Sequence, residues 1–276
     1  MPLSVEAITA QHIGDRQEQQ DRVAILSSRR IRGAALVVLA DGAGGHKGGA
    51  GAAEQVIRTA ANLFEDWSPN SESPETLLGS IVHEAHVVIR LNRVLTEEEP
   101  HSTVIAMLLQ PDRVDWAFVG DSRLYHFSGA QLLSRTSDHS LVEMHIKTGQ
   151  WPEAERHRHP HRHVLLQALG HAEPPMPDFG MAAPLRAGDT FLLCSDGLWD
   201  YVTDAELGKV LDALPPRQAA EVLVNGAEQL KKIGVLDSPT AAVQVTQKLQ
   251  ETFKLDTDTA RTVTESAVRN MHRWDR

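Results

Sequence analysis

Short apolar runs recur along this chain of 276 residues and limit the folds that it can adopt. Their length and the turn-forming residues around them are typical of buried strands. Turn signals at Pro111-Asp112 and Gly120-Asp121 separate three runs that follow one another closely. Such short connections favour antiparallel neighbours over crossover units. The predicted strands occupy residues 34–40, 104–109, 114–119, 124–127 and 190–194.

Helical patterns come in pairs between these runs. Residues 74–95 carry apolar side chains at helical spacing, and residues 51–67 form a second candidate just before them. Another pair, 204–214 and 217–233, is interrupted by Pro215-Pro216. Strands in clusters and helices in pairs predict an α+β fold.

Charge and composition exclude several classes of protein. The net charge is −10 and no lysine or arginine run stands out, which argues against nucleic acid or an anionic membrane as a partner. No stretch approaches about 18 consecutive apolar residues, and the first residues do not resemble a secretory signal. The single cysteine, Cys194, excludes an intrachain disulfide. We therefore expect a cytoplasmic monomer with no nucleic acid and no membrane partner.

Acidic residues stand where predicted strands end. Asp41, Asp121 and Asp196 each follow an apolar run and each has a glycine beside it. The strand holds such a carboxylate rigidly, and the glycine permits a tight turn. Any one of them could be an ordinary turn residue. Three carboxylates that converge would repel one another unless a cation lay among them, and oxygen ligands suit Mg²⁺ or Mn²⁺.

Six short motifs, in order, resemble those of the metal-dependent serine/threonine protein phosphatases, the PPM or type 2C family. The resemblance runs from about residue 14 to residue 245. The motifs are RQEQQD (16–21), DGAGGH (41–46), VGDSRLY (119–125), TSDHSLV (136–142), HPHRHVLLQALG (159–170, similar to the family's flap and its exit strand) and LLCSDGLWD (192–200).

The resemblance implies two packed antiparallel sheets flanked by pairs of helices, in one domain over residues 1–246, with a helical extension at 247–276. It also implies a centre of two Mn²⁺ or Mg²⁺ ions. Asp41, Asp196 and Asp237 would ligate them, Asp21 would support them directly or through water, and Gly42 would offer its carbonyl. Asp121 and Asp200, together with Asp196, match a third and weaker metal position.

The activity implied is hydrolysis of phosphoserine and phosphothreonine in proteins, in signalling that opposes a serine/threonine kinase. A metal-bridged hydroxide would attack phosphorus while Arg16 holds the phosphate, for which its guanidinium is suited. Phosphorylated proteins, and a kinase or its target, would be the partners. No phospho-enzyme is needed, so Cys194 is expected to be a core residue rather than a nucleophile.

The chain departs from the family's pattern at three places. Ala43 stands where eukaryotic relatives have a histidine, so His46 is a candidate proton donor, with a turn-stabilising role as the alternative. Ser238 replaces the asparagine that normally follows the last aspartate, Asp237. Residues 101–103 are His-Ser-Thr where Gly-Thr-Thr is usual.

Two segments leave alternatives open. Histidines alternate over residues 157–163; on a strand they could bind a transition metal, whereas a solvated loop that touches the substrate is favoured. Residues 256–276 have the pattern of an amphipathic helix, which could pack on the body or bind a partner.

Three other functions compete with the phosphatase. Glycines at 41–51 could bind a nucleotide phosphate, but Gly48 follows Lys47 where a P-loop needs serine or threonine. A pseudophosphatase could bind phosphoprotein as a regulator without turnover. A metal-dependent nuclease could use similar acids, but the negative net charge disfavours it.

Overall fold

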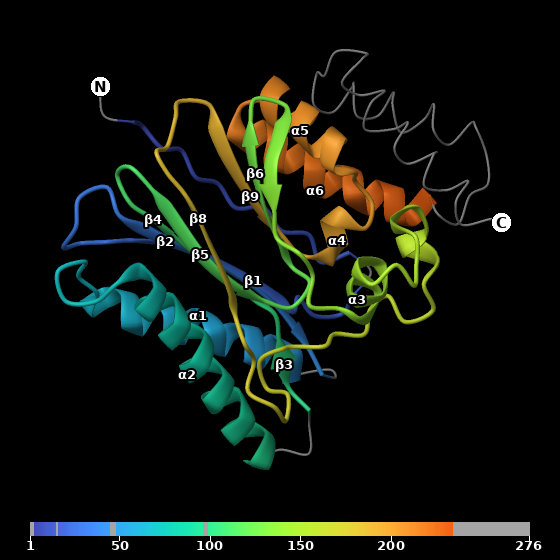
Figure 1. Ribbon diagram of the computed structural model, residues 1–276, viewed down its shortest axis with the longest axis horizontal. Coiled ribbons are helices and arrows are strands. Elements are labelled where there is room, and N and C mark those ends of the chain that lie inside the picture. Colours follow the sequence, from blue (N-terminus) through green and yellow to red (C-terminus); the bar gives the residue numbers. More distant parts are fainter. Residues whose placement is uncertain (1–2, 15, 45–47, 96–98, 234–276) are drawn as a thin grey trace. The chain divides into compact units, whose positions relative to one another are not determined.

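The computed structural model describes residues 3–14, 16–44, 48–95 and 99–233 (Figure 1). These residues form two compact units, and each is considered by itself. The first unit consists mainly of residues 16–124 and 136–187. The second contains residues 5–14, 125–135 and 188–233. No helix in the described part of the chain is both long enough and apolar enough to cross a bilayer.

The first unit is built on an antiparallel sheet with the strand order β1-β2-β4-β5-β8, and β3 pairs with the end of β2. Helices α1 and α2 lie along one face of this sheet (Figure 1). The elements are β1 (Asp21–Ser27), β2 (Ala35–Ala43), α1 (Gly48–Asp66), α2 (Pro74–Leu95), β3 (His101–Ser102), β4 (Val104–Leu109), β5 (Val114–Val119), α3 (Leu141–Lys147), the 3-10 helix η1 (Glu153–Arg158) and β8 (Asp178–Ala182).

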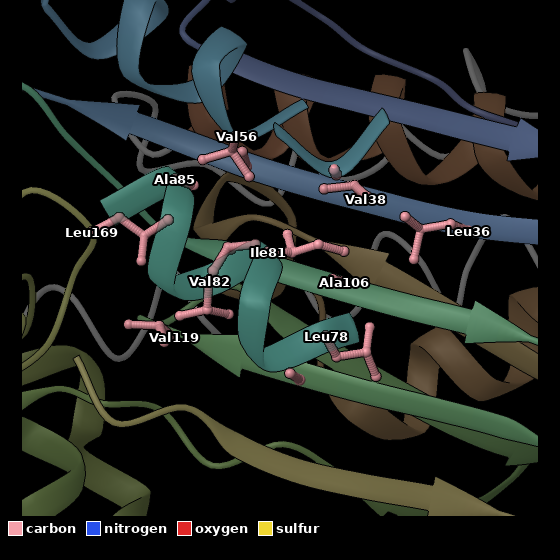
Figure 2. Packing of buried hydrophobic residues seen from close by; sticks show 14 of the residues in the cluster. Leu36, Val38, Val56, Leu78, Ile81, Val82, Ala85, Ala106, Val119 and Leu169 are labelled. Carbon is pink, nitrogen blue, oxygen red and sulfur yellow. The ribbon is translucent and has the colours of Figure 1, made fainter. Parts of the chain in front are cut away.

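The core of the first unit lies between the sheet and its two helices. Alternate residues of β2, among them Leu36 and Val38, are fully buried against α1 and α2. Val56 and Ile81 supply the helical side of this contact (Figure 2). The apolar face of each helix is thus buried on the sheet.

The second unit has a three-stranded sheet in the order β7-β6-β9. A second apolar core joins this sheet to helices, with Tyr125, Phe127 and Leu207 fully buried. The first two residues of β6, Arg123 and Leu124, belong to the first unit. The elements are β6 (Arg123–Ser128), β7 (Gln131–Arg135), β9 (Asp189–Cys194), α4 (Asp196–Trp199), α5 (Asp204–Ala213) and α6 (Pro216–Ile233).

Two antiparallel sheets with helices confirm the α+β prediction. Residues 74–95, 104–109 and 114–119 form the predicted helix and strands without any change of bounds. The predicted strand at 34–40 begins one residue later and continues to Ala43. The predicted elements at 51–67, 124–127, 190–194, 204–214 and 217–233 are also present, with ends that shift by at most three residues. The predicted helix at 256–276 lies outside the described residues.

Of the two interpretations of the histidine-rich segment, the strand is wrong and the favoured loop is closer to the structure. The alternating histidines do not lie on a strand, because residues 153–158 form η1 and turns follow. His159 is buried, and its Nε2 lies 2.9 Å from Nδ1 of His145 in a hydrogen bond. The expected exit strand at 159–170 is reduced to isolated bridges at Leu165 and Leu169.

Candidate functional site

Two of the predicted acids meet at the edge of the first unit's sheet. Asp21 is the first residue of β1, and its register partner in β2 is Asp41. Directly opposed residues of an antiparallel pair place their side chains on the same face, about 5 Å apart at Cβ. Like charges in this arrangement destabilise a sheet. A cation beside the two carboxylates would reverse that effect, and their oxygens are ligands that suit a hard ion.

Gly42 is buried because α1 begins directly on its backbone. A Cβ atom at position 42 would lie 2.0 Å from the carbonyl oxygen of Gly49 and 3.0 Å from that of Gln20. The Gly42 N–H also donates to the Gln20 carbonyl at 3.3 Å. Only glycine permits this approach of helix to strand. The residue after Asp41 is thus fixed from both sides.

Thr103, between β3 and β4, holds both polar backbone groups of Asp41. The Asp41 N–H donates to Thr103 Oγ1 at 3.0 Å, and the Thr103 N–H donates to the Asp41 carbonyl at 2.9 Å. The Ser102 hydroxyl donates to the same carbonyl at 3.1 Å. The Thr103 and Ser122 hydroxyls are 2.8 Å apart and hydrogen-bonded. Thr103 therefore connects the Asp41 strand end to the turn that carries Asp121.

Asp121 lies in a turn that packs tightly on Thr103. Gly120 has a φ of +107°, and a Cβ atom there would lie 2.6 Å from Thr103 Cγ2. Asp121 itself is only 8% exposed. The turn at residues 120–122 is therefore immobilised against the same threonine that holds Asp41. The prediction that an acid follows a buried strand is confirmed for Asp121, because β5 ends at Val119. Asp41 instead lies within β2, two residues before its end at Ala43.

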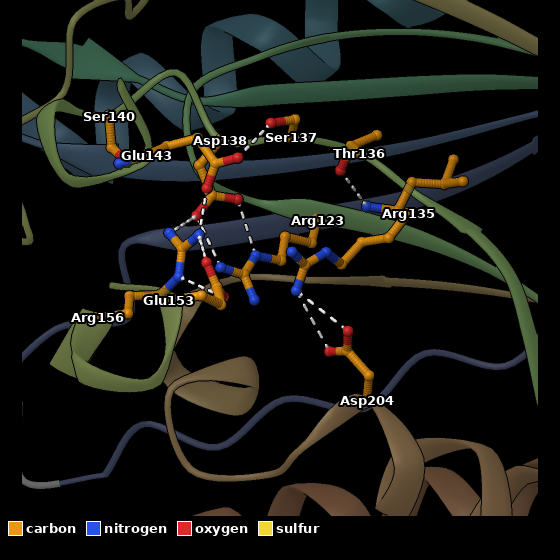
Figure 3. A network of polar contacts seen from close by, with 11 residues as sticks. Arg123, Arg135, Thr136, Ser137, Asp138, Ser140, Glu143, Glu153, Arg156 and Asp204 are labelled. Carbon is orange, nitrogen blue, oxygen red and sulfur yellow. Dashed lines mark hydrogen bonds and ion pairs between the residues drawn. The ribbon is translucent and has the colours of Figure 1, made fainter. Parts of the chain in front are cut away.

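A buried network of charged side chains lies beside this turn (Figure 3). Arg123 donates to both carboxylate oxygens of Asp138 at 2.8 and 2.7 Å, and both side chains are almost fully buried. Arg156, from η1, donates to Asp138 at 3.2 Å and also bonds to Glu143 on α3. Ser137 donates to Glu143 at 2.6 Å. These contacts join α3 and η1 to the start of β6.

The neighbours of Glu143 in this network stabilise its ionised form. Burial raises the pKa of Glu143, but hydrogen bonds from Ser137 and Arg156 and the positive charge of Arg156 lower it by more. The net effect is a pKa below its ordinary value, so the Glu143 carboxylate is ionised at neutral pH. Its charge is compensated within the first unit.

In the second unit, β9 delivers Asp196 and Asp200 to the short helix α4. Asp196 is the first residue of α4 and Asp200 is its C-cap, and the Asp200 N–H donates to the Asp196 carbonyl at 3.1 Å. Residues four apart in a helical turn share one face. Cys194, the last residue of β9, is buried in the second core, which confirms its predicted core position.

The remaining predicted site residues are differently placed. Arg16 is exposed, and its guanidinium donates to Gln20 Oε1 at 3.4 Å. His46 and Asp237 lie outside the described residues. Within the described ranges, no three or more histidine, cysteine, aspartate or glutamate side chains are grouped so as to hold a metal ion. The roles assigned to the site residues, including His46 and Asp237, stay predictions.

The site also contains residues that sequence reasoning did not assign. Thr103 was noted only as part of a departure from the family's pattern, and His139 only as a letter in TSDHSLV. The backbone N–H of His139 donates to the Gly120 carbonyl, and His139 Nδ1 accepts a hydrogen bond from the Gly120 N–H. Their position in the two motifs was the available signal, since their partners are distant in sequence.

The family called Protein phosphatase 2C matches residues 8–233 of the chain. The serine/threonine phosphatase stp of Listeria innocua is 32% identical over 180 residues, which cover 64% of this chain and 71% of that protein. Its name gives no support to the pseudophosphatase alternative.

Solved structures of phosphatases share the fold. The serine/threonine phosphatase of S. agalactiae is 30% identical, with a TM-score of 0.70 over 78% of this chain and 89% of its own. The catalytic domain of the serine/threonine protein phosphatase PstP, solved in complex with two manganese ions, is 28% identical, with a TM-score of 0.65 over 78% of this chain and 86% of its own.

Proposed function

Because the chain belongs to the protein phosphatase 2C family and is a metal-dependent serine/threonine protein phosphatase, we propose that it hydrolyses phosphoserine and phosphothreonine in proteins at a centre of two Mn²⁺ or Mg²⁺ ions. The observation that supports this centre most directly is the register pairing of Asp21 with Asp41. Two carboxylates opposed in this way are unfavourable as neighbours without a cation.

The donor atoms on the first unit's sheet fit a hard divalent ion. We assign Asp41 and the Gly42 carbonyl as ligands, with Asp21 acting directly or through water. Asp196 and Asp237 would complete the pair of ions, and Asp121 and Asp200, with Asp196, would hold a third and weaker one. When bound, such ions lower the pKa of a water towards about 7 and neutralise charge on phosphoryl oxygens.

The chain's own side chains would supply the rest of the chemistry. Arg16, which is exposed before β1, would bind two phosphoryl oxygens through its guanidinium fork. Water supplies the oxygen that bonds to phosphorus while the bond to the serine or threonine oxygen breaks. The leaving oxygen takes up a proton, and His46 is the candidate donor. No covalent phospho-enzyme forms.

The cellular setting follows from this reaction. A phosphatase for serine and threonine opposes a kinase of the same specificity, and the partners would be that kinase or its target proteins. We retain the cytoplasmic location, the monomeric state and the domain limits of 1–246 and 247–276 as proposals.

Phosphate release from a phosphothreonine peptide and from p-nitrophenyl phosphate tests the proposal. With Mn²⁺, we expect turnover by the wild type and a loss of at least about 100-fold in kcat/KM for Asp41→Asn, because that change removes a ligand charge. Asp66→Asn is the matched control, since Asp66 is an exposed residue at the end of α1. Inactive metal-loaded wild type, indistinguishable from Asp41→Asn, would disprove the proposal.

A further inference from the structure

One histidine of the first unit engages both polar backbone groups of the residue that precedes Asp121. The backbone N–H of His139 donates to the Gly120 carbonyl at 2.9 Å. In the opposite direction, the Gly120 N–H donates to His139 Nδ1 at 3.3 Å. Both backbone groups of Gly120 are therefore hydrogen-bonded to a single residue that is 19 positions away in sequence.

The His139 ring is itself held on two further sides. It stacks on Phe118 of β5, with ring centroids 4.9 Å apart and planes inclined by 18°. Its Nε2 lies 3.3 Å from Asp178 Oδ2 on β8. Because Nδ1 accepts a hydrogen bond, the neutral ring carries its proton on Nε2, where it can donate to Asp178. The contacts therefore select one ring tautomer and one ring orientation.

The turn requires these hydrogen bonds because Gly120 does not fix its own backbone. Its φ of +107° lies in a region that glycine enters freely, and glycine has no side chain to limit rotation of the adjacent peptides. Thr103 blocks one side, since a Cβ atom at Gly120 would lie 2.6 Å from Thr103 Cγ2. Rotation of the peptide that joins Gly120 to Asp121 would re-aim the Asp121 carboxylate.

We propose that His139 is a positioning residue that holds the turn at Gly120 and thereby orients Asp121 for metal binding. The proposal rests on the metal-dependent function proposed above. His139 acts through hydrogen bonds to Gly120, and Asp178 and Phe118 act through the His139 ring. The effect on catalysis therefore depends on the Nδ1 position and only weakly on the bulk of the ring.

Two substitutions of His139 separate its two nitrogen positions. In His139→Asn the side-chain oxygen falls near the place of Nδ1, so the acceptor for the Gly120 N–H is kept and the contact with Asp178 is lost. In His139→Gln the amide reaches towards Asp178 and the acceptor at the Nδ1 position is lost. The measurement is the Mn²⁺ concentration that gives half-maximal hydrolysis of the phosphothreonine peptide. We expect a rise of about tenfold for His139→Gln and less than threefold for His139→Asn.

Thermal unfolding measures stability separately from the Mn²⁺ dependence of hydrolysis. Thermal unfolding in EDTA should place the two variants within a few degrees of each other, although only His139→Asn retains the wild-type Mn²⁺ dependence. Equal Mn²⁺ dependence of the two variants, whether shifted or unshifted, would overturn the positioning role.

Wild-type protein provides a test that needs no variant to fold. Nitrogen-15 spectra of the His139 ring should show the proton on Nε2, and the Gly120 amide should exchange slowly with solvent. A proton on Nδ1, or a freely exchanging Gly120 amide, would overturn the proposal. If the wild type is inactive or Asp41→Asn is fully active, the proposed function fails, and these spectra still decide whether His139 holds the turn.

Discussion

The strand ends around Asp41 and the charge network around Asp138 lie in the same unit but are held in different ways. The strand ends depend on the close approach of backbone at Gly42 and of the Thr103 side chain at Gly120, and on neutral hydroxyls such as that of Thr103. The network depends on full charges, with Arg123 and Asp138 paired and almost completely buried. Steric fit fixes the first region, and charge balance fixes the second. The two regions should therefore fail under different kinds of substitution.

The largest effect is expected when the charge balance is broken. Arg123→Met leaves the buried Asp138 carboxylate with its hydrogen bond from Arg156, at 3.2 Å, but without its bidentate partner. Removing one partner of a buried pair typically costs about 3–5 kcal/mol of the free energy of unfolding. Urea unfolding of the metal-free protein measures this loss.

Arg135→Met is the matched control for that prediction. Arg135 pairs with Asp204 in the second unit, at 3.1 Å, but both side chains are partly exposed (Figure 3). A pair of this kind contributes about 0–1 kcal/mol. If the two arginine substitutions destabilise the protein equally, burial is not what makes the Asp138 network important.

A smaller loss is expected where backbone approaches are closest. Gly42→Ala places a methyl group 2.0 Å from the backbone oxygen of Gly49, which no change of rotamer can relieve. Overpacking of this kind costs about 1–3 kcal/mol. We also expect loss of phosphatase activity, because helix α1 must move away from the residue after Asp41. Thermal unfolding and peptide hydrolysis measure the two effects.

Gly51→Ala, in the same helix, should act in the opposite direction. A Cβ atom at Gly51 meets nothing within 4 Å, and alanine is favoured over glycine inside a helix by about 0.5–1 kcal/mol. Unfolding at higher temperature than wild type is therefore expected. An equal loss of stability in both variants would show that the cost at position 42 does not come from its close approach to Gly49.

The smallest effect is expected from pH, and it distinguishes neutral from charged contacts. His86 is 2% exposed and accepts the Gly170 N–H at Nδ1, 3.2 Å away. Burial, followed by the charges of Arg90, His83 and His171, lowers its pKa below the ordinary value of about 6.5. The unfolded chain therefore binds more protons below that pH, and stability falls as pH decreases from 6.5.

The charge network should respond only to stronger acid. The pKa of Glu143 is lowered, so its contribution is present above about pH 4.3, the ordinary value, and is lost as pH falls further. Between pH 7.5 and 5.5 we expect the contribution of His86 to the free energy of unfolding to fall by less than about 1.4 kcal/mol per pH unit, the limit for one proton. His86→Asn, which keeps an acceptor for Gly170, should flatten this slope, and Glu143→Gln should not. The opposite ranking would contradict the assignment.

The sequence was sufficient where both faces of a strand are buried. Residues 104–109 and 114–119 are almost entirely apolar because β4 and β5 lie inside the sheet. Neither β1 nor β8 was predicted, and these are the two edges of the same sheet. An edge strand is partly exposed and carries mixed side chains, so its pattern resembles that of a loop.

For the site, the sequence revealed the acids but not the groups that orient them. Aspartate beside glycine after an apolar run can be recognised locally, as at Asp41 and Asp121. The bond from Asp41 to Thr103 spans 62 positions, and the bond from Gly120 to His139 spans 19. Such pairings follow from strand register, which no short window of sequence contains.

The contact between Gly42 and Gly49 also has a genetic consequence. Every single-nucleotide missense change in a glycine codon introduces a residue with a Cβ atom, and a Cβ atom at position 42 collides with main-chain atoms. Every amino-acid replacement by a single-nucleotide change at this codon is therefore expected to disturb the fold. A substitution there would have to be accompanied by a second change that moves the start of helix α1.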